Sequence, residues 1–543
     1  MISWGEWLGT RISLRSGPFW PVACAACGSG SSGSESLGVA SAKFEPGACP
    51  SSVATYLASQ DAECGYLVVP ENRTKHNSPE IRLPVAIIPS VTKPALPDPI
   101  VHMTGGPGGD ALGEAQSLVQ FKLNQNRDLI IMDQRGDKDT DPELTCTAID
   151  IFNEEVIGLR YDAASTEALH VAATQSCHDT FVSQGIDLSA FNTTENSSDF
   201  ADLFKIMRKR LGFKQWNVYG FSYGTYLALS YLRDHPEGIR SVIIDSVAPP
   251  SVVTLGWTWT NANEGVNNIF RACTADPACN AEYGDLAGTF ASLVQKYEAN
   301  PLTTTAINPD GDSVNVVIDG GHLINWLAAA PQPTIPFPPF APTNGIPAAI
   351  QALANGNPEP IATSRAYFTS AAGRGLFGHG LAFGVFCSEW VPFEPESQIL
   401  TQGLLAFPTY PDSVLSQAPQ LAFMTQDCAI WNVPAASPSV RQVTISPVPT
   451  LVITGSFDGR TSPQWGLYAA STLQNSTNIV IPGAGHWVTA QSTCAQDVIA
   501  SFLSNPLAPD TSCVSELTPP PFSSSFTVVT PDTLDEDLTD FAI

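Results

Sequence analysis

The chain has 543 residues, of which 43% are hydrophobic, so it can bury a large core and is long for one compact domain. It carries 25 Lys and Arg against 52 Asp and Glu, a net charge of −27. This negative charge argues against nucleic acid or an anionic membrane surface as a partner. The sequence contains no run of 18 or more apolar residues, and hence no ordinary transmembrane helix. We expect one core domain with a large insertion.

The first residues have the features of a targeting segment. Two arginines precede a short, mostly apolar stretch that ends at Cys27, and a Gly/Ser-rich run follows. We expect a signal or lipoprotein-type leader over residues 1–27, with Cys27 as a candidate for lipid attachment, and a flexible linker over 28–44. The protein would then be exported to the extracellular space or cell envelope, with a lipid anchor as one alternative.

Twelve cysteines point to the same compartment. None has the spacing of a zinc site, so we expect disulfide bonds formed in an oxidising environment. Sequence does not fix their connectivity. The ten that follow the leader fall into neighbouring pairs along the chain, namely Cys49 and Cys64, Cys146 and Cys177, Cys273 and Cys279, Cys387 and Cys428, and Cys494 and Cys513.

The first β-rich stretches, residues 66–69 and 81–88, are expected to be antiparallel edge strands, and Pro84 agrees with an edge position. A short buried-type strand over residues 99–103 follows, and the next such strand covers residues 128–133.

A glycine-rich loop, Thr104–Asp110, leaves the strand at 99–103. It lacks the Gly-Lys-Ser/Thr ending and the GxGxxG spacing of phosphate loops. It suits an oxyanion loop, in which the N–H of Gly106 and that of Tyr223 point to the same place. Asp133 and Arg135, in the Asp-Gln-Arg-Gly segment at the next strand end, are expected to tie that strand to the glycine loop.

Residues 216–230 have the pattern strand, sharp turn and helix, and the turn is a Gly-x-Ser-x-Gly pentapeptide centred on Ser222. A serine at such a bend projects its hydroxyl out of the sheet. The helix that follows offers backbone N–H groups to an anion at its start. The pentapeptide alone is a weak signal, so its weight depends on the strand, the helix and the other motifs of the chain.

Further strands and helices alternate along the chain, which predicts a mainly parallel sheet covered by helices on both faces, and thus an α/β fold. Between residues 250 and 445 prolines cluster and helical segments predominate. The organisation expected is a leader at 1–27, a linker at 28–44, a first core part at 45–249, a cap insertion at 250–445, a second core part at 446–513 and a disordered acidic tail rich in Pro and Ser at 514–543.

Ser222, Asp458 and His486 follow strands in the chain order expected of a nucleophile, an acid and a base in an α/β-hydrolase. His486 would take the proton of Ser222, while Asp458 would hold the imidazole tautomer. Asp245 is the alternative acid, since it also ends a strand. His102 is the alternative base, although its place before the glycine loop favours a structural role.

The segments 105–109, 133–136, 220–225, 455–458 and 483–487 together resemble those of the secreted tripeptidyl aminopeptidase and proline iminopeptidase group of α/β-hydrolases. The resemblance spans roughly residues 45–513 and is looser in the insertion. Two departures concern Asp137-Lys-Asp-Thr after the Asp-Gln-Arg-Gly segment and Thr104 in a place often held by glycine.

The resemblance implies the α/β-hydrolase fold and a serine exopeptidase that cleaves peptides from a free N-terminus through an acyl-enzyme, without metal or organic cofactor. Glu389 in the insertion is the candidate for binding the substrate's α-ammonium group, and Glu264 is the alternative. A carboxylesterase with the same triad remains an alternative activity. A non-catalytic binding protein on this fold is a third, but such proteins usually lack a triad member.

Overall fold

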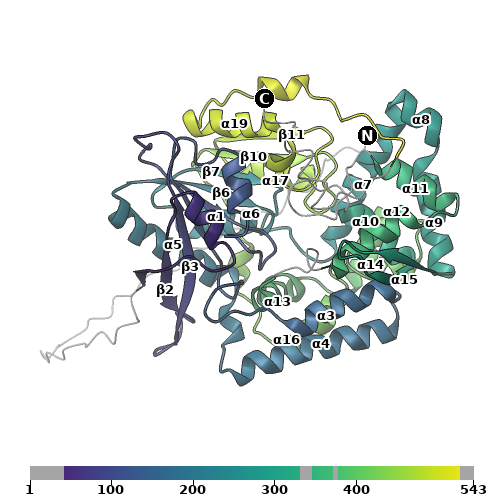
Figure 1. The fold of residues 1–543 in the computed structure, drawn as a ribbon, viewed down its shortest axis with the longest axis horizontal. Helices are drawn as coiled ribbons and strands as arrows, with labels where there is room; N and C mark the ends of the chain where they lie inside the picture. Colours follow the sequence, from purple (N-terminus) through teal and green to yellow (C-terminus); the bar gives the residue numbers. More distant parts are fainter. Residues whose placement is uncertain (1–41, 330–344, 371–376, 526–543) are drawn as a thin grey trace, which may run out of the picture. The chain divides into compact units, whose positions relative to one another are not determined.

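A computed structural model describes residues 42–329, 345–370 and 377–525, which include one large mixed sheet (Figure 1). The sheet has nine strands in the order β1-β2-β3-β5-β4-β6-β7-β10-β11. From β5 to β11 neighbouring strands are parallel, whereas β1, β2 and β3 are antiparallel to their neighbours. The strands are β1 (Lys43–Pro46), β2 (Glu63–Pro70), β3 (Glu80–Ile88), β4 (Ile100–Met103), β5 (Leu129–Met132), β6 (Trp216–Phe221), β7 (Ile239–Asp245), β10 (Thr450–Gly455) and β11 (Ser476–Ile481).

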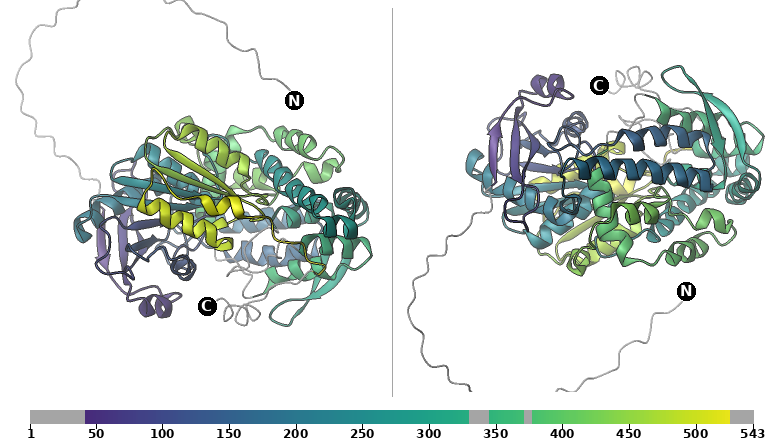
Figure 2. Two further views of the ribbon diagram at one scale, coloured as in Figure 1. Left: turned by 90° about the horizontal axis from the view of Figure 1, so that it is seen from above. Right: turned by 90° about the horizontal axis from the view of Figure 1, so that it is seen from below.

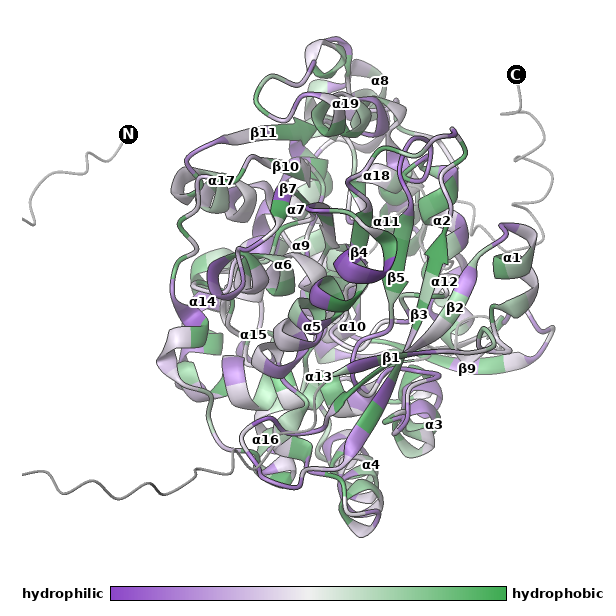
Figure 3. Ribbon diagram, turned by 90° about the vertical axis from the view of Figure 1, so that its left-hand side faces the viewer, coloured by the Kyte–Doolittle hydropathy of each residue, from purple (hydrophilic) through white to green (hydrophobic). Residues whose placement is uncertain are grey.

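Both faces of the central part of this sheet are buried, because successive side chains along its inner strands enter different apolar clusters. On β5, Ile130 and Met132 join one cluster, and Leu129 and Ile131 join the other. Such strands are apolar at nearly every position, as Figure 3 shows for the central strands. The expected mostly parallel sheet with helices on both faces is therefore present.

Helices cover the two faces of the sheet, namely α1 (Ala54–Ser59), α2 (Ala115–Gln120), α5 (Thr193–Leu211), α6 (Tyr223–Asp234), α17 (Pro463–Thr472), α18 (Val488–Gln491) and α19 (Thr493–Ser504). The helices α3 (Thr147–Glu155) and α4 (Ala164–Ser183), which also lie between β5 and β6 in sequence, pack against each other. Asn192 caps α5 by accepting the N–H of Glu195, and Gly212 ends the helix in the left-handed conformation.

Ten helices lie between β7 and β10 in the described chain and gather beside the carboxyl end of the sheet (Figures 1 and 2). They are α7 (Trp257–Ala275), α8 (Pro277–Tyr283), α9 (Leu286–Ala299), α10 (Gly320–Ala329), α11 (Ile346–Ala354), α12 (Glu359–Ala366), α13 (His379–Val385), α14 (Ser397–Ala406), α15 (Asp412–Leu415) and α16 (Met424–Trp431). Helix α4, which precedes the sharp turn at Ser222 (the elbow) in sequence, packs against α16 through Phe181 and Trp431.

The same stretch contains a β-hairpin that the sequence analysis did not anticipate. Strands β8 (Leu302–Ile307) and β9 (Ser313–Ile318) pair antiparallel and form a separate two-stranded sheet (Figure 2). Their buried side chains include Val316 and Ile318, which join the larger apolar cluster. The stretch is thus mainly, but not wholly, helical.

The assignment of β2 and β3 as edge strands is wrong. β1 pairs with β2 on the outer side, and β5 pairs with β3 on the inner side. Pro84 is tolerated inside the sheet because the ladder with β5 begins only at Val85, where no N–H of Pro84 is required. β1 also begins inside the stretch expected to be a flexible linker.

Residues 514–525 contradict the expectation of a disordered tail, because they are placed against the rest of the chain. A short 3₁₀ turn covers Ser512–Glu516, Pro520 lies against Gly483, and Phe522 packs on the larger apolar cluster. The leader, the lipidation candidate Cys27 and residues 526–543 lie outside the described residues. Within the described part of the chain, no helix has the length and apolar character needed to cross a membrane.

Ten of the twelve cysteines form five disulfide bonds, and each joins the two cysteines that are neighbours in the chain. The bonds are Cys49–Cys64, Cys146–Cys177, Cys273–Cys279, Cys387–Cys428 and Cys494–Cys513. Such bonds persist in oxidising compartments. They indicate that the protein is exported.

Candidate active site

Ser222 lies at a sharp turn between β6 and α6, as the pentapeptide predicts. Its backbone has φ 55° and ψ −124°, a strained conformation for a residue with a side chain. The turn brings α6 so close to β4 that a Cβ on Gly224 would lie 1.9 Å from the carbonyl oxygen of Met103. Only glycine fits there. Ser222 itself remains partly exposed to solvent.

The structure brings Ser222, His486 and Asp458 together from loops that follow β6, β11 and β10. The hydroxyl oxygen of Ser222 is 2.9 Å from Nε2 of His486, and Nδ1 of the same imidazole is 2.9 Å from Oδ2 of Asp458. Asp458 and His486 are buried. The imidazole can therefore exchange a proton with the serine on one side while the carboxylate fixes its tautomer on the other.

The Asp458 carboxylate also organises its own loop. Oδ1 accepts the N–H groups of Arg460 and Thr461 at 2.8 and 2.9 Å, and Oδ2 accepts the Thr461 hydroxyl at 2.8 Å. Burial alone would raise the pKa of Asp458, but His486 and the bonds from Thr461 outweigh it and hold this pKa below its ordinary value. The carboxylate is therefore kept ionised opposite the imidazole.

Helix α7, the first after β7, supports the same loop from outside. Asn261 donates to the carbonyl of Arg460 at 2.9 Å, and Asn268 donates to that of Ser456 at 2.6 Å. Glu264, the alternative ammonium-binding residue of the sequence analysis, is half-buried on this helix and accepts the N–H of Gln464 at 3.3 Å. The position of Asp458 thus depends on contacts made by α7.

Asp245, the alternative acid, holds the chain beyond His486 instead of the imidazole. Its two oxygens accept the N–H groups of Val488 and Thr489 at 3.0 and 2.9 Å, and the Thr489 hydroxyl at 2.6 Å. Gln491 completes this support by donating to the carbonyl of His486 at 2.7 Å. Asp245 therefore positions the loop that carries the histidine.

The glycine loop lies beside the serine. A Cβ on Gly105 would come within 2.8 Å of Cβ of Ser222, so Gly106 follows directly after the point of contact. Tyr223 is the first residue of α6, and its N–H consequently has no acceptor within the helix. Tyr223 is bonded directly to Ser222, and Gly106 follows the glycine that approaches Ser222. Both proposed oxyanion donors therefore lie next to the serine.

A buried hydrogen-bond network fixes the start of the glycine loop. Gln134 donates to the carbonyl of Thr104 at 2.9 Å, and the Thr104 hydroxyl donates to Glu114 at 2.6 Å. The same carboxylate lies 2.5 Å from Nε2 of His102. His102, the alternative base, is therefore engaged in the core next to Glu114.

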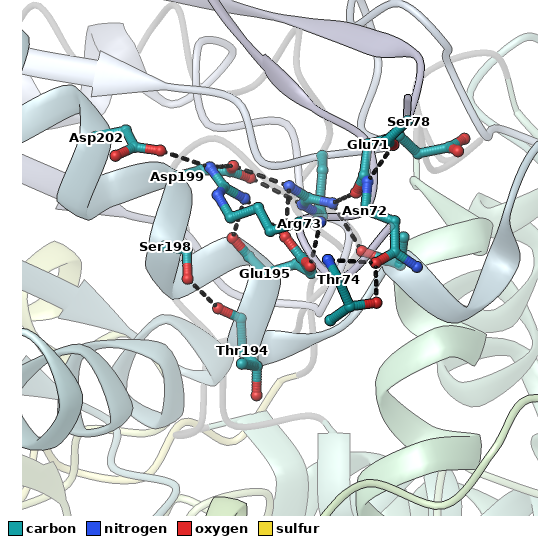
Figure 4. A network of polar contacts seen from close by, with 12 residues as sticks. Glu71, Asn72, Arg73, Thr74, Ser78, Thr194, Glu195, Ser198, Asp199 and Asp202 are labelled. Carbon is teal, nitrogen blue, oxygen red and sulfur yellow. Dashed lines mark hydrogen bonds and ion pairs between the residues drawn. The ribbon is translucent and has the colours of Figure 1, made fainter. Parts of the chain in front are cut away.

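The expectation that Asp133 and Arg135 tie the strand to the glycine loop holds only in part. Asp133 accepts the N–H of Leu112, just beyond the loop. Arg135 instead forms two hydrogen bonds with Asp199 on α5. Asp199 also pairs with Arg73, which binds Glu195 and Asp202 in the same ionic network (Figure 4). The local sequence does not indicate this contact of Arg135, because Asp199 is 64 residues away in sequence.

Glu389 lies in a π-helical turn, Phe386–Trp390, which the Cys387–Cys428 disulfide joins to α16. The carboxyl group is fully buried, and Oε1 accepts the N–H of Thr193 at 2.7 Å. Oε2 makes no hydrogen bond of ordinary geometry among the described residues, although the Tyr226 phenol interacts with the same carboxyl group. Burial raises the pKa of Glu389 above its ordinary value, although the bond from Thr193 opposes this shift.

Thr193 links this carboxyl group to the neighbourhood of the serine, because its hydroxyl lies 2.9 Å from the phenol oxygen of Tyr223. Glu389 is thus two contacts away from the residue that follows Ser222. The tryptophan beside it, Trp390, is buried, and its ring lies 4.6 Å from that of Phe386. A buried aromatic ring at this position keeps water from the carboxyl group of Glu389.

Sequence reasoning missed Thr461, which contacts both Asp458 and His486. Its hydroxyl oxygen lies 3.1 Å from Nδ1 of the imidazole. A signal was available for the contact with Asp458, because an Asp followed by Gly and, three residues on, by Thr is a common turn with bonds from N–H groups to the Asp. The contact with His486 had no such signal.

Comparisons with known families agree with this geometry. Residues 98–277 match a family model described as alpha/beta hydrolase fold, and residues 415–514 match one described as TAP-like protein. The first match covers the glycine loop, the elbow and Asp245, and the second covers Asp458 and His486.

Curated relatives extend over most of the chain. A tripeptidyl aminopeptidase of Streptomyces coelicolor is 24% identical over 486 residues, covering 84% of each chain. The serine protease Hip1 of Mycobacterium tuberculosis is 21% identical over 468 residues, covering 81% of this chain and 85% of the relative. Among solved structures, an esterase from Exiguobacterium antarcticum matches with a TM-score of 0.33 at 12% identity, covering 78% of this chain and 96% of the esterase.

Proposed function

Because the chain is a serine hydrolase of the α/β-hydrolase fold with relatives named tripeptidyl aminopeptidase and serine protease, we propose that it is an exopeptidase acting on peptides with a free N-terminus. The observation that carries the hydrolase part of this proposal is the chain of two 2.9 Å contacts from Ser222 through His486 to Asp458, and the named relatives support the peptidase part over an esterase. These two contacts form the arrangement that activates a serine hydroxyl for attack on a carbonyl carbon.

In the first step, the Ser222 hydroxyl oxygen bonds to the carbonyl carbon of the substrate while its proton passes to Nε2 of His486. The oxyanion that forms is stabilised by the N–H groups of Gly106 and Tyr223. His486 then donates the proton to the leaving nitrogen, the C–N bond breaks, and an acyl-enzyme remains. Asp458 stabilises the imidazolium throughout.

In the second step, water attacks the acyl carbon. His486 removes a proton from that water and returns it to Ser222, which releases the acyl group as a carboxylic acid. The loop contacts from Thr461 and α7 keep Asp458 and His486 in position through both steps. Removing the hydroxyl of Ser222 should therefore abolish covalent chemistry without disturbing this support.

An exopeptidase must bind the free N-terminus of its substrate and close the site beyond that end. We assign this role to the insertion, residues 250–445. Its first helix bonds the Asp458 loop, and its turn at Phe386–Trp390 places Glu389 two contacts from Tyr223. Oε2 of this buried carboxyl group makes no hydrogen bond of ordinary geometry among the described residues and would be the acceptor for a substrate ammonium group. Such a charge pair would fix the distance between the substrate's N-terminus and Ser222.

The proposal is tested with matched peptide amides that have free or acetylated N-termini, assayed with the purified protein and with Ser222→Ala. We expect cleavage of the free peptides, loss of cleavage after acetylation, and a rate decrease of on the order of 10³-fold or more in the variant. Equal cleavage of acetylated peptides would contradict exopeptidase action. Near-normal turnover by a folded Ser222→Ala variant would contradict the assignment of the nucleophile.

A further inference from the structure

Phe377 is a large aromatic residue that remains 43% exposed although it lies against the glycine loop of the site. Its Cε1 atom is 3.2 Å from the position that a Cβ on Gly106 would occupy. A Cβ on Gly105, the preceding residue, would lie 2.8 Å from Cβ of Ser222. The partly exposed ring of Phe377 therefore lies against the residue that follows the point where the loop approaches the serine.

The backbone beside this ring is fixed to the glycine loop. The N–H of Gly378 donates to the carbonyl of Gly108 at 2.7 Å. On its other side Gly378 approaches the Asp-Gln-Arg-Gly segment so closely that a Cβ would lie 2.6 Å from the carbonyl oxygen of Gly136. These contacts of Gly378 fix the backbone next to Phe377 on the glycine loop. The exposed ring of Phe377 is therefore attached to a backbone that is held in place.

Ser222 is contacted by His486 at its hydroxyl group and by the glycine loop at its Cβ atom. On the His486 side, the ring of Phe221 lies 5.1 Å from the imidazole. The leaving nitrogen must occupy that side, because His486 donates a proton to it. The glycine loop approaches Ser222 at its Cβ atom, and Phe377 lies against Gly106 of this loop. The carbonyl oxygen of the acyl group must meet the proposed oxyanion donors Gly106 and Tyr223, so the acyl part of the substrate lies along this loop.

We infer that Phe377 forms an apolar wall of the subsite for the residue whose carbonyl group Ser222 attacks, and that the enzyme prefers a sizeable apolar side chain at this position. Burying an apolar side chain against the ring would remove both from water, which is favourable in proportion to the area buried. A glycine at the same position would gain nothing from the ring. This inference rests on the proposed function, because it assumes an acyl-enzyme at Ser222.

The test uses peptide 4-nitroanilides of the form Ala-Ala-X, with X as Gly, Ala, Leu or Phe and a free N-terminus. Wild type should turn over the Leu and Phe substrates with the higher kcat/KM. Phe377→Ala should lower kcat/KM for these two by about tenfold and change that for Gly by less than about twofold. Phe368→Ala, at a residue 39% exposed on the turn Tyr367–Thr369, serves as the matched control and should change neither.

Two results would overturn the inference. An equal loss for all X would mean that the substitution disturbs the glycine loop, and an unchanged preference would mean that the ring does not meet the side chain. Labelling of Ser222 by a fluorophosphonate separates these results from a failure of the proposed function. If Ser222 is labelled and free peptides are cleaved while the preference survives in Phe377→Ala, the inference alone fails. If Ser222 is not labelled, the proposed function fails.

Discussion

The carboxylate of Asp458 lies 2.9 Å from Nδ1 of His486 and at the same time accepts two N–H groups of its own loop. A second strand-end carboxylate, Asp245, binds the main chain two and three residues beyond the histidine. The two aspartates therefore have separable tasks. One acts on the imidazole, and the other acts on the backbone that carries it.

This separation predicts different consequences for the two amide variants. Asp458→Asn should lower kcat by on the order of 10⁴-fold, because an amide cannot stabilise the imidazolium or enforce the tautomer, while the fold is retained. Asp245→Asn should lower the melting temperature, because the amide nitrogen would face N–H donors. Steady-state kinetics and thermal melts of both variants check this. Unchanged turnover in Asp458→Asn would contradict the assignment of the acid.

Thr461 is predicted to be a positioning residue for Asp458 and His486. Thr461→Val removes the hydroxyl that lies between Asp458 and His486 at nearly constant volume, and we expect kcat to fall by about tenfold, the effect of one lost hydrogen bond to a charged group. Thr461→Ser keeps the hydroxyl and should retain most of the activity. Pre-steady-state acylation rates would show the loss directly. A loss of activity in Thr461→Ser but not in Thr461→Val would mean that the methyl group, not the hydroxyl, matters.

The central sheet could be predicted from sequence because its strands are short apolar runs bounded by turns. The run containing Val218 and Tyr219 is fully buried, as periodicity implied. The β8–β9 hairpin carried a signal too, since two β-branched runs flank Asp310-Gly311, but the surrounding helical pattern was given more weight. The interior position of β3 could not be seen, because it depends on which strands pair with it.

The triad could be predicted because each member follows a strand within a recognisable local motif. Contacts between distant segments could not. Phe377 meets the glycine loop across more than 260 residues of sequence, and Arg135 meets Asp199 on a helix that the local pattern did not connect with it. Such contacts depend on how the insertion and α5 pack against the sheet. Hydrophobic periodicity predicts which face of a helix or strand is buried, but it does not predict which other element covers that face.

The buried Asp133 predicts a pH-dependent contribution to stability. Burial raises its pKa well above the ordinary value, and the nearby Asp110 adds to the shift. Above the unfolded pKa of about 3.9, the native state holds a proton that the unfolded chain has lost, so stability falls as the pH rises through this interval. Asp133→Asn removes that dependence. Relative to wild type, its melting temperature should therefore be higher at pH 8 than at pH 5.

Asp187 provides a control of opposite sign. Burial would raise its pKa, but the Lys75 ammonium and two further side-chain hydrogen bonds outweigh this and lower it. Its contribution to stability is present above the unfolded pKa and lost on acidification. Asp187→Asn should accordingly be more destabilised relative to wild type at pH 8 than at pH 4. The same direction in both variants would contradict the assignment for Asp133.

The last prediction concerns how a chain end is recognised. Glu389→Gln retains an acceptor for the N–H of Thr193, removes the negative charge and replaces Oε2 by an NH₂ group, which cannot accept from an ammonium group. If Oε2 receives the substrate's ammonium group, kcat/KM for free peptides should fall by roughly 10- to 1000-fold, the effect of losing a charge-assisted contact of about 1.5–4 kcal/mol. Hydrolysis of a small neutral ester should be nearly unchanged, since it has no ammonium group.

Glu264→Gln is the matched control, because that glutamate is the alternative recognition residue and also accepts one main-chain N–H. A selective loss on peptides in Glu264→Gln but not in Glu389→Gln would transfer the role to α7. Equal losses on peptide and ester in Glu389→Gln would instead indicate that the carboxyl group supports Tyr223 through Thr193. In that case the oxyanion site would be weakened for every substrate, and acylation of Ser222 by a fluorophosphonate should slow to the same extent.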